Sequence, residues 1–192
     1  GYVDMATGIA LLFNIRLPIN FNSPYKATSI INFWQKWHIT LSNFLTNYIY
    51  YPWVKSLKVV NFSKIMIIIF FVFLIAGIWH GPSWLFVIFG MLHGMGLITN
   101  HLYRKLFGYK LNKYFSCFLT FNYINLTFVF FRSSSLENSI NIIKVMLGMN
   151  GFENTTYFED KIYIMVTLLV AIIISFSFKN TGYLIDKFKI DK

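Results

Sequence analysis

The sequence predicts an all-α fold, a polytopic membrane helix bundle in which some helices are short, broken or amphipathic. Three observations predict it. Hydrophobic residues make up 56% of the chain and charged residues only 12%, whereas soluble domains contain about 25% charged residues. The charges gather in short basic clusters, and the uncharged runs between them are long enough to cross a bilayer. The same composition excludes intrinsic disorder, and the single cysteine excludes a disulfide scaffold.

The net charge of +10 raises the question of a nucleic-acid partner. The basic residues do not form a stripe along one soluble face. They flank the uncharged runs, as cytoplasmic loops of membrane proteins do. We therefore expect the lipid bilayer as a partner and no nucleic acid.

The longest uncharged run extends from Ile65 to Tyr103. As one helix it would measure about 58 Å, nearly twice the hydrocarbon core of about 30 Å. The segment Trp79-His80-Gly81-Pro82-Ser83 interrupts it, and Pro82 suits the first turn of a new helix. We predict two helices that meet there. The first ends at Trp79 after about 22 Å, so His80 is expected within the depth of the membrane.

Two later runs predict single passes, Tyr114 to Phe131 and Ile162 to Phe178. The first of them contains Asn122, Asn125 and Thr127. Polar side chains in a bilayer are expected to face other helices or a cavity.

The uncharged segment from Trp37 to Val54 predicts an amphipathic helix rather than a spanning one. Two stripes follow helical spacing, the apolar Trp37, Leu41, Phe44 and Tyr48 and the polar His38, Ser42 and Thr46. His38 is expected on the polar face.

The loops predict the orientation of the chain. Lysines and arginines without acidic residues precede Ile65 and follow Tyr103, so both of these loops are expected in the cytoplasm. The segment after Phe131 mixes acidic and basic residues, as an outside loop does.

The four histidines are the candidate functional residues, because an ionisable side chain within a bilayer is costly. For His80 a catalytic and a structural role remain open, and for His38 a solvated position at the interface is the alternative. His93 is expected to pack within a helix bundle and His101 to lie at the interface near Arg104. The spacing of the histidines and the lack of nearby acidic residues predict no metal site.

Gly90 and Gly94 have the spacing of a close helix contact. They also belong to a series of six motifs along the chain. The motifs are Gly1-Tyr2-Val3-Asp4-Met5-Ala6, Leu17-Pro18-Ile19-Asn20-Phe21-Asn22, Phe33-Trp34-Gln35-Lys36-Trp37-His38-Ile39-Thr40-Leu41-Ser42, Gly77-Ile78-Trp79-His80-Gly81-Pro82-Ser83-Trp84, Gly90-Met91-Leu92-His93-Gly94 and Phe130-Phe131-Arg132-Ser133. The series resembles the bacterial membrane-bound O-acyltransferase family, in the order in which that family has these motifs. The nearest branch modifies cell-surface polymers and includes alginate and peptidoglycan O-acetyltransferases and the protein that D-alanylates teichoic acid.

The resemblance implies a multi-pass enzyme of the cell membrane whose helices surround an intramembrane tunnel. It implies an acyl donor from the cytoplasm, an acyl-CoA or acyl carrier protein thioester, and no permanently bound cofactor. The acceptor would be a hydroxyl group of a cell-surface polysaccharide, and a separate periplasmic acetyltransferase is left open as a further partner. Residues 1–192 would form the C-terminal part of a single domain whose N-terminal helices are missing.

The invariable histidine of the family maps onto His80. We expect His80 to act as general base, because imidazole, with an unperturbed pKa near 6.5, is largely neutral at physiological pH and can take the proton of a sugar hydroxyl. A second family histidine maps onto His38, which would orient the acceptor or stabilise charge on the thioester oxygen. The chain departs from the family at Gln35-Lys36, Thr46-Asn47 and Pro82, which puts charge-based contacts at positions 35, 36, 46 and 47 in doubt. D-alanyl transfer and a non-catalytic transport or assembly subunit remain alternatives.

Overall fold

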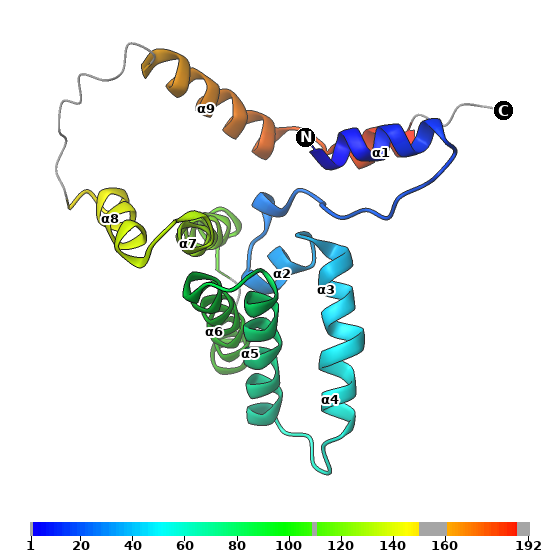
Figure 1. The fold of residues 1–192 in the computed structure, drawn as a ribbon, viewed down its shortest axis with the longest axis vertical. Coiled ribbons are helices and arrows are strands. Elements are labelled where there is room, and N and C mark those ends of the chain that lie inside the picture. Colours follow the sequence, from blue (N-terminus) through cyan, green and yellow to red (C-terminus); the bar gives the residue numbers. More distant parts are fainter. Residues whose placement is uncertain (1, 109–110, 150–160, 188–192) are drawn as a thin grey trace.

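The computed structural model describes residues 2–108, 111–149 and 161–187, and all regular elements within these ranges are helical. This confirms the predicted all-α bundle (Figure 1). The elements are α1 (Tyr2–Leu12), the 3-10 helix η1 (Pro24–Lys26), α2 (Ile30–Trp34), α3 (Ile39–Leu45), the π-helix η2 (Thr46–Tyr50), α4 (Tyr51–Lys55), α5 (Phe62–Trp79), α6 (Trp84–Phe107), α7 (Lys113–Arg132), α8 (Leu136–Met146), α9 (Lys161–Ser177) and α10 (Thr181–Lys187).

Three helices, α5, α6 and α7, are long and apolar enough to cross a membrane. The long uncharged run is split as predicted, since α5 ends at Trp79 and α6 begins at Trp84. The side chain of Asn61 accepts from the backbone N–H of Lys64 and caps the start of α5. At 1.5 Å per residue α5 is about 27 Å long and α6 about 36 Å.

The turn between α5 and α6 depends on Gly81, whose φ of 151° lies in a region that favours glycine. Ser83 caps α6 by accepting from the backbone N–H of Leu85. Pro82 therefore stands just before the cap and not in the first turn, where the sequence placed it. The serine hydroxyl can satisfy a helix N–H, and proline lacks a side chain that could do so.

Glycines bring the backbones of α5 and α6 together. A Cβ atom at Gly77 would lie 2.4 Å from the carbonyl oxygen of Phe86, and one at Gly90 would lie 2.5 Å from that of Phe73. At Gly94 the added atom would meet the Cα atom of Phe70 at 3.1 Å. The predicted close contact at Gly90 and Gly94 is confirmed.

Side-chain contacts give the direction of the three long helices. The Lys105 ammonium at the end of α6 lies 4.1 Å from the centre of the Phe62 ring at the start of α5, so the two basic loops lie at the same end. Tyr123 of α7 donates to the carbonyl oxygen of Leu92 at 2.6 Å. The later part of α7 thus runs beside the early part of α6, and Phe131 reaches the ring of His80 at the opposite end.

The segment after Trp37 differs from the predicted amphipathic helix. His38 precedes α3 as its N-cap residue, with φ 43° and ψ 53°, so it does not lie on the polar face of a helix. The predicted apolar stripe is divided. Trp37 packs in the core between α2, α6 and α7, Leu41 borders the core beside α5, and Tyr48 is 70% exposed.

The polar residues of α7 have different surroundings, and only some of them match the prediction. Thr127 is buried, as predicted, and Asn125 lines a hollow of about 400 Å³ between α7 and α8. The prediction is wrong for Asn122, which is exposed and donates to the carbonyl oxygen of Phe118 on its own helix. That local bond satisfies the amide nitrogen without a neighbouring helix.

The fourth predicted pass is also helical, as α9. It is shorter than α5, α6 and α7. Its C-terminal end contacts α7, where the centres of the Phe176 and Phe121 rings lie 5.5 Å apart, and the rest of the helix extends away from the three long helices (Figure 1). The part of the structure that contains the candidate residues is therefore the group formed by α2 to α7.

Candidate active site

His80 follows the last residue of α5 and is half-buried. Its ring lies against aromatic rings from three elements, with centroid distances of 4.9 Å to Phe131, 5.9 Å to Phe89 and 5.2 Å to Trp79. Among the residues that the structure describes, none forms a hydrogen bond with the imidazole ring. Both ring nitrogens can therefore interact with a substrate.

His38 is held by Asn20, from the extended segment before η1. The Asn20 amide oxygen lies 3.2 Å from the His38 Nδ1 atom and accepts from the backbone N–H of Thr40 at 3.2 Å and from its hydroxyl at 3.0 Å. The backbone N–H of Ile39 donates to the Asn20 carbonyl oxygen at 3.0 Å. These contacts place the backbone around His38 in its left-handed conformation.

The contact with Asn20 also selects the tautomer of His38. The Thr40 backbone N–H can only donate, so the Asn20 atom that it meets is the amide oxygen. An oxygen of this kind accepts, and Nδ1 of His38 therefore carries the proton. In the neutral ring the Nε2 atom is left as a hydrogen-bond acceptor.

Aromatic rings of α7 connect the segments that carry His38 and His80. The Trp37 ring, next to His38 in the chain, packs 5.2 Å from the Phe128 ring, and the Phe131 ring lies 4.9 Å from the His80 ring. Burial lowers the pKa of His38 below its ordinary value. Burial also lowers the pKa of His80, in the turn between α5 and α6, and electrostatic repulsion from His38 lowers it further. The lowered pKa values favour the neutral form of both rings.

The other two histidines occupy different positions. His93 is fully buried in α6 and hydrogen-bonded to Trp34 and Thr127, which confirms the predicted packing role. His101 is half-buried on α6, three residues before Arg104. Within the described ranges, no three histidine, cysteine, aspartate or glutamate side chains lie close enough to share a metal ion.

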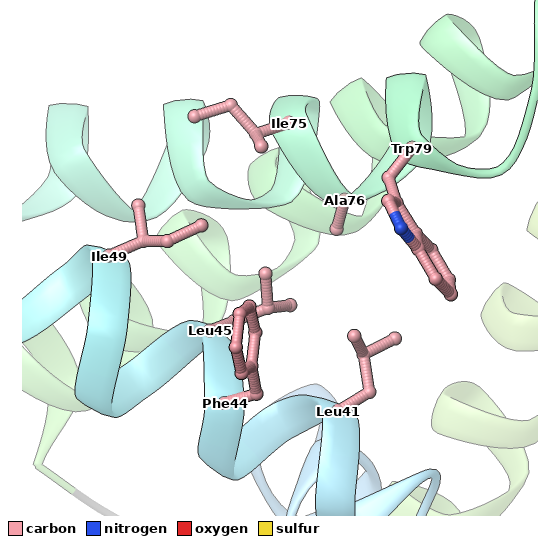
Figure 2. Close-up of a pocket in the computed structure, with 7 residues that line it drawn as sticks. All are labelled: Leu41, Phe44, Leu45, Ile49, Ile75, Ala76 and Trp79. Carbon is pink, nitrogen blue, oxygen red and sulfur yellow. The ribbon is translucent and has the colours of Figure 1, made fainter.

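An apolar hollow of about 320 Å³ opens between α3, η2 and α5, and neither His38 nor His80 lines it. Figure 2 shows that α3 and η2 form one wall and α5 the other, with the Trp79 indole at one end. The Trp79 ring lies 5.2 Å from the His80 ring. The lining residues are Leu41, Phe44, Leu45, Ile49, Ile75, Ala76 and Trp79. Such a lining accepts a hydrocarbon group and offers no charge to an ionic one. A continuous tunnel through the bilayer stays a prediction.

Comparison of the sequence with known protein families identifies the family of the chain. Residues 1–137 match the model of MBOAT, the membrane-bound O-acyltransferase family. The chain belongs to this family.

Three relatives show which branch of the MBOAT family this chain resembles. It is 42% identical over 217 residues to a peptidoglycan O-acetyltransferase of Helicobacter pylori, an alignment that covers 100% of the chain and 40% of that protein. It is 31% identical over 152 residues to a probable alginate O-acetylase AlgI of Azotobacter vinelandii (79% of the chain, 30% of the relative). It is 29% identical over 153 residues to a teichoic acid D-alanyltransferase of Streptococcus thermophilus (68% and 37%). The chain thus spans about 40% or less of the length of these relatives.

The family match confirms the resemblance drawn from the ordered motifs. MBOAT proteins are multi-pass membrane proteins, in agreement with the three helices long enough to span a bilayer. Sequence reasoning missed Asn20 as a partner of His38. Its position in the Leu17 to Asn22 motif was the available signal, but the sequence alone does not show which side chain the amide contacts.

Proposed function

We propose that the full-length MBOAT protein transfers an acyl group to a hydroxyl group of a cell-surface polysaccharide, with acetyl as the favoured acyl group. The donor would be an acyl-CoA or acyl carrier protein thioester that arrives from the cytoplasm. The names of the relatives support this class of reaction. The observation that carries the proposal is the pair His80 and His38, both half-buried and both favouring the neutral form. Trp79, whose ring packs against His80, lines the apolar hollow.

His80 acts as the general base in this proposal. Its neutral ring takes the proton of the acceptor hydroxyl while the hydroxyl oxygen attacks the thioester carbonyl carbon. The resulting tetrahedral intermediate expels the thiolate, which recovers the proton from the His80 ring. Positioned proton transfer of this kind contributes a factor of about 10² to 10⁴ in rate.

The tautomer of His38 supports one of its two expected roles. With the proton on Nδ1, the neutral ring offers Nε2 as an acceptor for a second hydroxyl group of the acceptor sugar, because the reacting hydroxyl gives its single hydrogen to His80. Stabilising negative charge on the thioester oxygen would instead require a proton on Nε2, hence a charged ring, which burial disfavours. His38 therefore orients the acceptor sugar in this proposal.

The test measures acetate released by alkali from the cell-surface polymer of cells that carry the full-length protein. Wild type is compared with His80→Ala, with the matched control His101→Ala and with a deletion strain, at equal membrane levels. We expect deletion-level acetate in His80→Ala and nearly wild-type acetate in His101→Ala. Activity of His80→Ala above about a tenth of wild type would contradict the general-base role, given the size of that effect.

Two alternatives are decided by the same cells. The match to teichoic acid D-alanyltransferases favours D-alanine as a second acyl group. Absence of acetate in every strain, with D-alanine ester lost in His80→Ala, would establish it. Equal acetate in wild type and His80→Ala, above the deletion strain, would instead identify a non-catalytic subunit.

Two further experiments test the donor and the periplasmic partner. Acetyl-CoA or acetylated carrier protein, supplied to membrane vesicles, distinguishes the two donors. Deletion of a periplasmic acetyltransferase tests that further partner.

A further inference from the structure

His93 joins three helices through a single buried ring. Its Nδ1 atom accepts from the indole N–H of Trp34 on α2 at 3.2 Å, and its Nε2 atom lies 3.0 Å from the hydroxyl oxygen of Thr127 on α7. That hydroxyl donates its hydrogen to the carbonyl oxygen of Ile124 at 2.7 Å. The indole can only donate and the threonine hydrogen is already used, so Nε2 must carry the proton. One neutral tautomer satisfies every group at this junction.

Two of the joined helices form the aromatic surroundings of His80. On α6, the Phe89 ring lies 4.4 Å from the His93 ring and 5.9 Å from the His80 ring. On α7, Phe131 follows Thr127 by one helical turn and lies 4.9 Å from the His80 ring. A change in the bond between His93 and Thr127 would therefore shift the rings that contact His80.

The third helix leads to His38. Trp34 is the last residue of α2, four residues before His38. Between them, the Trp37 ring packs 5.2 Å from the Phe128 ring of α7. The bond between Trp34 and His93 thus ties the start of the His38 segment to the helix that begins just after His80.

We propose that His93 is a positioning residue for the acyl transfer, which fixes His38 and His80 relative to each other without contacting substrate. This inference rests on the proposed function. We expect His93 to affect the rate of the chemical step, because that rate depends on the separation and alignment of the reacting groups. A displacement of about 1 Å can lower the rate about 10²-fold. Binding of the donor should change little, since His93 is buried away from the apolar hollow.

The chain supplies a matched control for simple loss of packing. Tyr123 also joins α6 to α7, through its bond to the carbonyl oxygen of Leu92 at 2.6 Å. It forms no bond to α2 within the described residues. Tyr123→Phe removes one buried bond between helices without releasing α2.

The experiment compares His93→Phe, His93→Asn and Tyr123→Phe in the full-length protein at equal amounts of folded protein. His93→Phe keeps a flat ring and loses both bonds, and we expect kcat to fall about 10²-fold while KM for the donor stays within about twofold. In His93→Asn the amide oxygen occupies the place of Nδ1 and can still accept from Trp34, so we expect partial recovery of kcat. Tyr123→Phe should keep kcat near wild type.

Trp34→Phe provides a second variant if replacement of His93 prevents folding. It removes the bond to α2 and leaves His93 in place, and we expect the same loss in kcat with unchanged KM. Equal losses of kcat in the Tyr123 variant and in the His93 or Trp34 variants would overturn the proposal. Loss confined to donor KM would overturn it as well.

A measurement without turnover separates this proposal from the proposed function. Diethyl pyrocarbonate modifies neutral imidazole rings, and mass spectrometry gives the rate at each histidine. We expect His93→Phe to change the rates at His80 and His38 by more than about threefold and to leave His101 unchanged, with no such change in Tyr123→Phe. If the wild type transfers no acyl group, the proposed function fails and these rates decide the positioning role. Unchanged rates in that case would overturn it.

Discussion

Replacement of Gly77 by alanine tests whether the close contact between α5 and α6 supports the site. The new Cβ atom would lie 2.4 Å from the Phe86 carbonyl oxygen and 2.9 Å from the Gly90 Cα atom. Ordinary contacts begin near 3.4 Å, so the helices must separate by about 1 Å. Overpacking of this kind costs about 1–3 kcal/mol, and alanine returns about 0.5–1 kcal/mol of helix preference. Gly77→Ala should therefore be destabilised by up to about 2.5 kcal/mol.

The assay is thermal unfolding of the full-length protein in detergent together with acyl transfer. Gly8→Ala on α1 is the matched control, because a Cβ atom there meets nothing within 4 Å. Gly8→Ala should keep or raise the melting temperature and keep activity. Gly77→Ala should melt lower and lose about 10²-fold in rate, since His80 moves with the end of α5. Equal melting temperatures and equal activities in the two variants would refute the reasoning.

Three further predictions concern the residues around the turn and His38. Because burial and His38 lower the pKa of His80, the ring stays a neutral base at pH values where a free imidazole is protonated. The decrease of kcat/KM at acid pH should therefore have its midpoint below pH 6.5. A midpoint above pH 6.5 would contradict the assignment of His80 as the general base. Asn20→Ala removes the acceptor for His38 Nδ1 and should lower kcat by about 10- to 100-fold, measured against donor KM, which should not change. Ser83→Ala removes the cap of α6 and should cost about 0.5–2 kcal/mol, seen as a lower melting temperature, whereas an unchanged one would show that the cap contributes little.

The break between α5 and α6 was predictable from the sequence because its causes are local. Pro82 interrupts a helix wherever it stands, and Gly81 permits a backbone conformation that other residues rarely adopt. The uncharged lengths on either side then place the helices. The exact start of α6 was not predictable. The helix begins at Trp84, after its cap at Ser83, whereas the sequence placed Pro82 in the first turn.

The placement of His38 was not predictable from periodicity. Helical spacing assigned it to the polar face of a continuous helix, but contacts with Asn20 stabilise a left-handed backbone at that position. Those contacts join residues that are 18 apart in the sequence. Periodicity indicates which face of a segment would be polar if the segment were helical. The start of this helix is instead set by contacts with a residue from another segment.

His93 illustrates the same limit within a helix. The sequence indicated a packed residue, and burial confirms it. Its two partners come from α2 and α7, 59 and 34 residues away. No local pattern distinguishes a histidine that bonds two helices from one that only fills space.

The lengths of the helices determine how far each reactant must travel. The helix rises about 24 Å from Lys64 to His80, and a hydrocarbon core is about 30 Å thick. With Lys64 at the cytoplasmic boundary, His80 lies about 6 Å inside the opposite one. In the proposed reaction the thioester crosses most of the bilayer and so requires a long, slender arm, whereas the polysaccharide inserts little more than the sugar that reacts.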